Sequence, residues 1–150
     1  MRAVIQRVKR ASVMVDGEEY SAINSGLCCL VGIEKLDSRD DIEYLARKIC
    51  KVRIFEDDTG LMNLDVEQTG GDILVISQFT LLGDARKGRR PSFTLSEEPG
   101  SAERLFNELV ERIRQIHPGH VAPGKFQAMM DVNIVNHGPV TILLDSRKQF

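Results

Sequence analysis

The sequence predicts an α/β fold, either a three-layer β/β/α sandwich or a barrel-like pair of sheets, with two main helices on one side. Several short segments carry apolar residues that alternate with polar ones or run without interruption, as in strands. Two longer segments repeat apolar residues at helical spacing. Because strand-like segments occur before, between and after the helices, we expect the helices to cover one side of the sheets. No linker-like segment divides the sequence, so residues 1–150 are expected to form a single domain.

The N-terminal part of the chain is predicted to be mostly strand. Residues 4–8 and 12–15 are short apolar segments typical of strands, and the Asp16-Gly17 pair after them predicts a hairpin turn. Residues 27–33 form a nearly continuous apolar run, which indicates a strand that is buried on both faces.

Further strands are predicted along the rest of the chain. Residues 53–55 and 62–64 are brief strand-like segments on either side of an acidic turn. Residues 73–76 predict another buried strand. Near the C-terminus, residues 125–135 alternate between apolar and polar, which indicates a half-buried strand, and residues 140–144 resume as a second one.

Two helices are predicted, each with its own boundary signals. Ser38 and Asp41 have the spacing of a capping box, in which the side chain of each residue accepts a hydrogen bond from the backbone of the other. The apolar residues that follow at helical spacing are Ile42, Leu45, Ala46, Ile49 and Cys50. The second helix is expected to begin near Ser101 and to end before Pro118-Gly119. Its apolar stripe consists of Ala102, Leu105, Phe106, Leu109, Val110, Ile113 and Ile116.

Composition narrows the classes of protein to consider. The first residues lack the long apolar core of a secretory signal, and no run approaches the roughly 20 apolar residues of a membrane span. We therefore expect a cytoplasmic protein without a membrane span. Cys28, Cys29 and Cys50 lack the spacing of metal ligands, which predicts buried free thiols.

The charges are unevenly distributed although their sum is only −2. Arg86, Lys87, Arg89 and Arg90 form a basic group in a glycine-containing loop. Such a local group fits a limited contact with phosphates, for example at one end of an RNA. A solvated basic loop is equally consistent with this pattern.

The sequence lacks the motifs of several common kinds of active site. His117 and His120 flank Pro118-Gly119, where a helix cannot continue, so they do not form a regular metal-binding pair. The sequence has neither the glycine-rich motifs that bind nucleotide phosphates nor the G-x-S-x-G motif of many hydrolases. We therefore expect no metal and no cofactor.

Two polar motifs remain as candidates for a site. Ser77 and Thr80 follow a strand, where sites often form, but a nucleophilic Thr80 would need a neighbouring base. His137 is the only histidine near another suggestive motif, Gly138-Pro139, and is a weak candidate for that base. Gly138-Pro139 is most simply a hairpin turn. Alternatively, it presents rigid backbone carbonyls that another molecule can approach closely.

The combination of motifs resembles the D-aminoacyl-tRNA deacylase family over essentially the whole chain. The segments that carry the resemblance are 1–8 (MRAVIQRV), 62–64 (MNL), 77–81 (SQFTL), 88–93 (GRRPSF), 124–126 (GKF) and 136–141 (NHGPVT), in this order. One position departs from the family pattern: His137 stands where the family usually has Asp between Asn and Gly.

The resemblance implies a homodimer whose active sites lie at the subunit interface. In the family pattern, Gly138-Pro139 has a cis peptide bond, crosses into the partner's site and holds the amino group of the substrate there, leaving no room for an L side chain. Residues 77–80 (Ser77, Gln78, Phe79 and Thr80) form the catalytic wall around the 3′ end of the aminoacyl-tRNA, with backbone N–H groups for the oxyanion. Arg7 braces the Gly-Pro segment, and Met129 lines the pocket.

The function that follows from the resemblance is hydrolysis of the ester of D-aminoacyl-tRNA, and of mischarged glycyl-tRNA, as chiral proofreading in translation quality control. Because the sequence offers Thr80 no convincing base, help from the 2′-OH of the terminal ribose is preferred over a Thr80 nucleophile. The alternative from another class is a non-catalytic module that binds an RNA end through residues 86–90.

Overall fold

The computed structural model describes residues 1–149. In chain order the elements are β1 (Arg2–Val15), β2 (Glu18–Ile23), β3 (Gly26–Gly32), α1 (Arg39–Lys51), β4 (Phe55–Glu56), β5 (Met62–Leu64), β6 (Asp72–Ser77), the 3-10 helix η1 (Phe79–Leu82), α2 (Pro99–Ile116), β7 (Val121–Pro123) and β8 (Asp131–Asp145). The main sheet has the strand order β2-β1-β3-β6-β7, and β8 pairs with β1. The short strands β4 and β5 form a second sheet.

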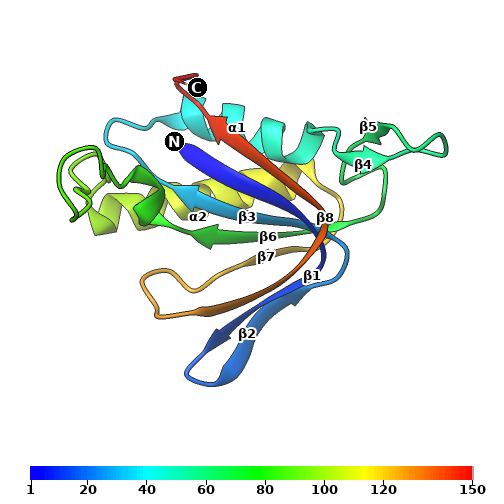
Figure 1. Cartoon of the computed structure of the whole chain (residues 1–150), viewed down its shortest axis with the longest axis horizontal. Helices are drawn as coiled ribbons and strands as arrows, with labels where there is room; N and C mark the ends of the chain where they lie inside the picture. The colour runs from blue at the N-terminus through cyan, green and yellow to red at the C-terminus, as the bar shows by residue number, and fades with distance from the viewer. Residues whose placement is uncertain (150) are drawn as a thin grey trace.

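The main sheet is bent into a nearly closed, barrel-like shape, and both helices lie on one side of it (Figure 1). Strands β3, β6 and β7 run parallel to one another, while β1 is antiparallel to β3 and to β8. The expected α/β fold with a barrel-like sheet pair and two main helices is therefore confirmed.

The two short strands expected at residues 4–8 and 12–15 are one continuous strand, β1. Lys9 and Arg10 are exposed and interrupt the apolar pattern, but the backbone continues in strand conformation through them. Strand β8 pairs with β1 from Arg2 to Met14, and the register shifts on either side of Val8. The pairing with β8 therefore spans both predicted segments. The Asp16-Gly17 turn that follows is confirmed, with positive φ at both residues.

Two expectations near the C-terminus are wrong. Residues 125–130 are not strand, since β8 begins at Asp131 and Gln127 has a positive φ of 59°. Gly138-Pro139 is not a hairpin turn either, because β8 runs through it from Asp131 to Asp145. The strand absorbs the dipeptide as an irregularity: Gln6 pairs with Thr141 and Val8 with Asn136, so four residues of β8 (137–140) face Arg7 alone.

Two clusters of buried apolar residues lie on the two faces of the main sheet. The helix-side cluster packs the apolar faces of α1 and α2 against residues such as Ile73 and Val75 of β6. Leu74 and Ile76, which alternate with them, point into the second cluster, inside the bent sheet. Strand β6 is buried on both faces, which explains its continuous apolar run.

The helix boundaries agree with the signals in the sequence. The Ser38–Asp41 capping box is present, with Asp41 accepting from the Ser38 N–H at 2.8 Å. Helix α2 begins at Pro99, slightly before the expected Ser101, and ends at Ile116, before Pro118-Gly119. No helix among residues 1–149 is long and apolar enough to cross a membrane.

The three cysteines are buried free thiols, as expected. Burial raises the pKa of Cys28 and of Cys50 to about 12. Burial also raises the pKa of Cys29. These thiols therefore have the environment of structural rather than reactive cysteines.

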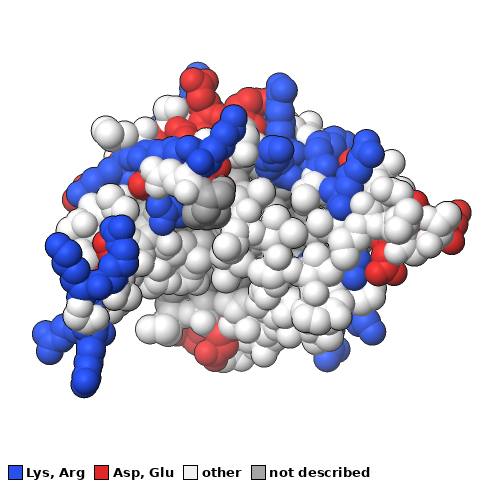
Figure 2. Space-filling model, turned by 45° about the horizontal axis from the view of Figure 1, so that its top comes forward, with Lys and Arg blue, Asp and Glu red and all other residues white. Residues whose placement is uncertain are grey.

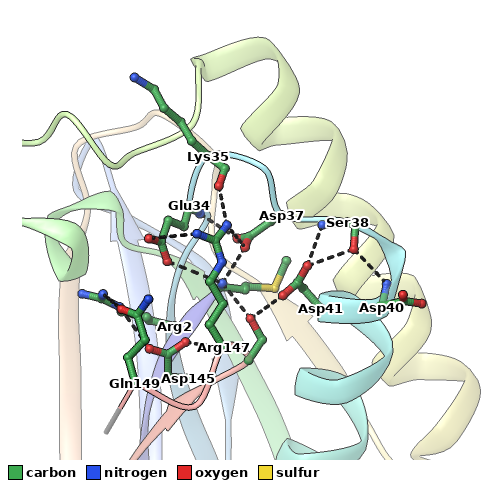
Figure 3. A network of polar contacts seen from close by, with 12 residues as sticks. Arg2, Glu34, Lys35, Asp37, Ser38, Asp40, Asp41, Asp145, Arg147 and Gln149 are labelled. Atoms are coloured by element: carbon green, nitrogen blue, oxygen red, sulfur yellow. Dashed lines mark hydrogen bonds and ion pairs between the residues drawn. The ribbon is translucent and has the colours of Figure 1, made fainter.

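A polar network joins the start of β1, the loop before α1 and the segment after β8 (Figure 3). The α-ammonium group of Met1 donates to Asp37 Oδ1 at 2.6 Å and to Ser146 Oγ at 2.8 Å. Arg147 pairs with Glu34 across the same network, at 3.3 Å. Burial raises the pKa of the Asp37 carboxyl, although the ammonium group and the Glu34 N–H favour its charged form.

Candidate active site

The first group of candidate residues lies where the parallel strands end. Residues 77–80 begin with the last residue of β6, Ser77. Gly124, which follows β7, donates its N–H to the carbonyl of Val75 in β6 at 2.8 Å. The carboxyl ends of parallel strands meet at one edge of a sheet, so residues 77–80 and the loop after β7 share that edge. Met129 lies in this loop and is 91% exposed, so within one protomer it lines no enclosed pocket.

The 3-10 helix η1 organises residues 78–82. The Gln78 N–H is held by the carbonyl of Val31 at 2.7 Å, and the Gln78 side chain donates to Thr80 Oγ1. The N–H groups of Phe79 and Thr80 open η1, where no intrahelical acceptor is available to them. They are therefore suitable donors for a developing oxyanion.

Two aromatic rings stand beside η1. Phe79 and Phe93 are in edge-to-face contact, with ring centroids 5.1 Å apart, and both remain exposed. Gly83 makes this contact possible, because a Cβ there would lie 2.9 Å from the Phe93 ring. No local sequence pattern predicts this role for Gly83, because the Phe93 ring comes from a residue ten positions later.

The expected basic residues project from a loop closed at its base by Asp84 and Ser92. These two residues exchange backbone hydrogen bonds of 2.8 and 2.9 Å. The guanidinium of Arg86 folds back onto Asp84 at 2.6 Å, which lowers the pKa of that carboxyl and raises the pKa of Arg86. Within residues 1–149, Lys87, Arg89 and Arg90 have no carboxylate partner. Basic side chains gather at this end of the molecule, at the left of Figure 2.

Gly138-Pro139 forms a second exposed feature, in the middle of β8. Its peptide bond is cis, and Gly138 has a φ of +128°. The buried guanidinium of Arg7 lies behind it: Nε donates to the His137 carbonyl at 3.0 Å and Nη1 to the Ile54 carbonyl at 2.7 Å. A Cβ on Gly138 would lie 2.8 Å from Val140 Cγ2 and 3.1 Å from Arg7 Nη2, so only glycine fits here without a shift.

Glu56 is a further residue at this second feature. Its carboxylate lies 3.6 Å from Arg7 Nη2. In the sequence, Glu56 belongs to an acidic turn, and no local pattern links it to Arg7, which lies 49 positions earlier. Only the tertiary structure brings the two together.

One protomer does not bring the two features together. Arg7, which faces Gly138-Pro139, pairs with Leu27, and Leu27 pairs with Ile73. Ser77 lies four residues beyond Ile73, which is about 13 Å along the strand direction. Across the sheet, three strand spacings separate β8 from β6, which is about 14 Å. His137 lies beside Arg7 and is therefore remote from Thr80 of the same chain, so it cannot serve as the base for that hydroxyl within one protomer.

The comparisons with known proteins address the whole chain. A family model described as D-Tyr-tRNA(Tyr) deacylase matches residues 4–145. The chain belongs to this family. Curated relatives named D-aminoacyl-tRNA deacylase include those of Caldicellulosiruptor bescii and Natranaerobius thermophilus. Each is 53% identical to this chain over 150 residues, and the match covers the full length of both proteins.

Two solved structures share the fold of this chain. A protein described as c-Myc DNA Unwinding Element Binding Protein is 44% identical, with a TM-score of 0.92 over 97% of this chain and 98% of that one. A probable eukaryotic D-amino acid tRNA deacylase shares the fold, with a TM-score of 0.80 at 17% identity over 95% of this chain and 97% of that one.

Among residues 1–149, no group of three or more His, Cys, Asp or Glu side chains is placed to hold a metal ion. The candidate groups are instead backbone donors at η1, backbone carbonyls beside Gly138 and exposed hydroxyls.

Proposed function

We propose that this chain hydrolyses the ester of D-aminoacyl-tRNA and releases the D-amino acid and free tRNA, acting on mischarged glycyl-tRNA as well. Membership of the deacylase family, over residues 4–145, and the full-length relatives support this activity. The site would take the 3′ end of the aminoacyl-tRNA in the cytoplasm, as part of translation quality control.

The observation that carries the mechanism is the separation of the two exposed features. Gly138-Pro139 lies beside Arg7 in the middle of β8, whereas residues 77–80 lie at the end of β6, three strand spacings away, and each is accessible from outside. A homodimer in which Gly138-Pro139 of one protomer enters the site of its partner would unite them. The active site is then formed only at the subunit interface, with residues 77–80 as one wall and Gly138-Pro139 as the other.

This arrangement provides a physical basis for chiral selection. The Gly138-Pro139 segment offers carbonyl oxygens and little side-chain volume, and Arg7 holds the His137 carbonyl from behind. Backbone carbonyls accept hydrogen bonds from the amino group of the substrate. With that group fixed, an L side chain would point into the backbone, whereas a D side chain or the hydrogen of glycine would not. Met129, from the loop after β7, would line the remaining side of the pocket.

The chemistry requires little from side chains. Water adds to the ester carbonyl carbon, the bond to the ribose oxygen breaks, and that oxygen takes up a proton. The N–H groups of Phe79 and Thr80 would stabilise the oxyanion, and the 2′-OH of the terminal ribose would assist the proton transfers. Thr80 has Gln78 as its side-chain partner, which donates a hydrogen bond and cannot remove a proton from the hydroxyl.

Hydrolysis of matched D- and L-aminoacyl-tRNA tests the activity directly. We expect rapid release of the D-amino acid, slow release of the L-amino acid, and unchanged rates after treatment with a chelator. Thr80→Ala then tests the chemistry: assistance by the 2′-OH leaves substantial activity, while a covalent Thr80 intermediate would require nearly complete loss.

Complementation tests the cross-subunit site. Gly138→Ala damages one wall, and the double variant Gln78→Ala/Phe79→Ala damages the other. In a mixed dimer, one of the two sites combines two intact walls, so the purified mixed dimer should have up to about half of the wild-type activity. The absence of any restoration in a verified mixed dimer would contradict a shared site.

The rival function is a non-catalytic module that binds a nucleic-acid end. The exposed basic loop at residues 86–90 and the name of one similar structure, a DNA Unwinding Element Binding Protein, keep it open. Purified protein that binds charged tRNA and does not release D-amino acid would favour this rival.

A further inference from the structure

A cleft between α1, β8 and the end of α2 combines an apolar floor with a basic rim. Its volume is about 660 Å³. Val52, Ile116 and Leu144 form the apolar part. The rim consists of Tyr44, Arg47, Lys48 and Lys51.

Two ammonium groups lie near the ring of Tyr44, which lines this cleft; Lys48 is a lining residue and Lys148 lies beside the cleft. Lys48 Nζ and Lys148 Nζ each lie 5.8 Å from the centroid of the Tyr44 ring. Both side chains are exposed, and within residues 1–149 neither has a carboxylate partner. Two like charges gathered around one ring favour an anion from outside the chain. By contrast, Arg47 and Lys51 are neutralised by Glu43 and Glu67.

The strand register relates this cleft to residues 77–80. Leu144 pairs with Ala3, Ala3 with Val31, and Val31 with Ser77. Leu144 and Ser77 are therefore at the same level of the sheet, three strand spacings or about 14 Å apart. An RNA whose 3′ end lies at residues 77–80 needs to extend by only a few nucleotides, at about 3.4 Å each when stacked, to reach the cleft.

We propose that the cleft around Tyr44, Lys48 and Lys148 binds the phosphate backbone of the RNA substrate close to its 3′ end. This inference rests on the proposed function, which supplies the RNA. The lysines neutralise phosphates, and the apolar floor with the Tyr44 ring accommodates the adjacent sugars. The cleft would be a second RNA contact, separate from the loop at residues 86–90.

The test is binding of an RNA minihelix with an amide-linked, non-hydrolysable D-aminoacyl group, measured over a series of KCl concentrations. Lys48→Gln/Lys148→Gln should weaken binding about tenfold at low salt and reduce the slope of log K against log salt by about 1 to 2. Lys48→Arg/Lys148→Arg, which keeps both charges, should bind like the wild type. The matched control is Arg39→Gln/Arg104→Gln, which removes the same formal charge from the groove between α1 and α2 and should change neither quantity.

The possible results distinguish a failure of the cleft proposal from a failure of the proposed function. If the wild type hydrolyses D-aminoacyl-tRNA but the lysine variant binds with unchanged affinity and slope, the cleft proposal is overturned and the function stands. An equal loss in the arginine control would also overturn it, because the effect would then be one of net charge alone. Lysine-dependent binding to vesicles of anionic lipid or to polyglutamate, without lysine-dependent RNA binding, would assign the cleft to another partner. If the wild type neither binds nor hydrolyses D-aminoacyl-tRNA, the proposed function itself fails.

Discussion

Arg7 Nε donates a hydrogen bond to the carbonyl of His137 at 3.0 Å, immediately before the Gly138-Pro139 peptide. The same guanidinium donates to Ile54 at 2.7 Å and lies 3.6 Å from Glu56. An arginine that is only 3% exposed thus ties the irregularity in β8 to the segment between α1 and β4. The exposed main chain at Gly138-Pro139 is supported from inside the protein.

Arg7→Met is expected to destabilise the chain and to loosen the Gly-Pro segment. Methionine keeps much of the side-chain volume but removes the donors to two carbonyls, which should lower the free energy of unfolding by about 2–4 kcal/mol. Urea unfolding measures this change. Arg10→Met, at an exposed position of the same strand, is the control and should change stability little. Equal stability of the two variants would show that the Arg7 hydrogen bonds contribute nothing.

Gly138→Ala is expected to impair discrimination between D and L substrates. The φ of +128° strains any residue with a Cβ, and that Cβ would lie 3.0 Å from the backbone N of Val140. We expect a stability loss of about 1–3 kcal/mol and a lower ratio of kcat/KM for D over L substrates. Gly60→Ala is a matched control, since Gly60 also has positive φ but has open space around it. A D-to-L ratio as high as that of Gly60→Ala would argue against a role in selection.

Arg89→Gln/Arg90→Gln is expected to weaken tRNA binding and to flatten its dependence on salt. Two phosphate contacts fewer should reduce the slope of log K against log salt by about 2. Arg86→Gln should have a smaller effect, because Asp84 already pairs with that guanidinium. Filter binding between low and moderate KCl measures both effects. If Arg86→Gln produced the larger change, the free arginines of the loop would not be the phosphate ligands.

Glu43→Gln is expected to weaken the contact between the two helices. Arg112 of α2 donates to both Glu43 oxygens, at 2.6 and 2.9 Å, and these hydrogen bonds help to lower the pKa of Glu43 to about 2. A carboxyl whose pKa is lowered by folding stabilises the protein above its unfolded pKa, and this contribution is lost as the pH falls. Wild-type stability should therefore fall between about pH 4.5 and pH 2, and that fall should be smaller in Glu43→Gln. Thermal unfolding at several pH values measures it. An identical pH profile in both proteins would contradict the expected linkage.

The three thiols are expected to be unreactive in the folded protein. Burial raises the pKa of Cys28 and Cys50 to about 12, so the thiolate is scarce at pH 8, and all three sulfurs are inaccessible to reagents. Titration with a chromogenic disulfide at pH 8 should detect almost no thiol in the native state and three after denaturation. Rapid modification of native protein with loss of activity would contradict this expectation.

The local elements of this protein follow from patterns among neighbouring residues. Continuous apolar runs, the Ser38 capping box and the two helical stripes each follow from neighbouring residues, so the strands β3 and β6 and both helices could be predicted within a few residues. The motifs at residues 77–80 and 136–141 were also visible as local patterns, and so were the buried cysteines.

Other features depend on strand pairing between distant segments, which local patterns do not encode. A loop at residues 125–130 appeared as a strand because its residues alternate in polarity, and Gly138-Pro139 appeared as a turn because glycine and proline usually mark one. In the folded chain, β1 supplies a ladder that carries β8 straight through the dipeptide. The register of four strands then separates residues 77–80, at the end of β6, from Gly138-Pro139, in the middle of β8. It also lets Arg7 contact Ile54, Glu56 and His137. These relationships depend on strand pairing between segments far apart in the chain, and pairing of that kind leaves no signal in the neighbouring residues.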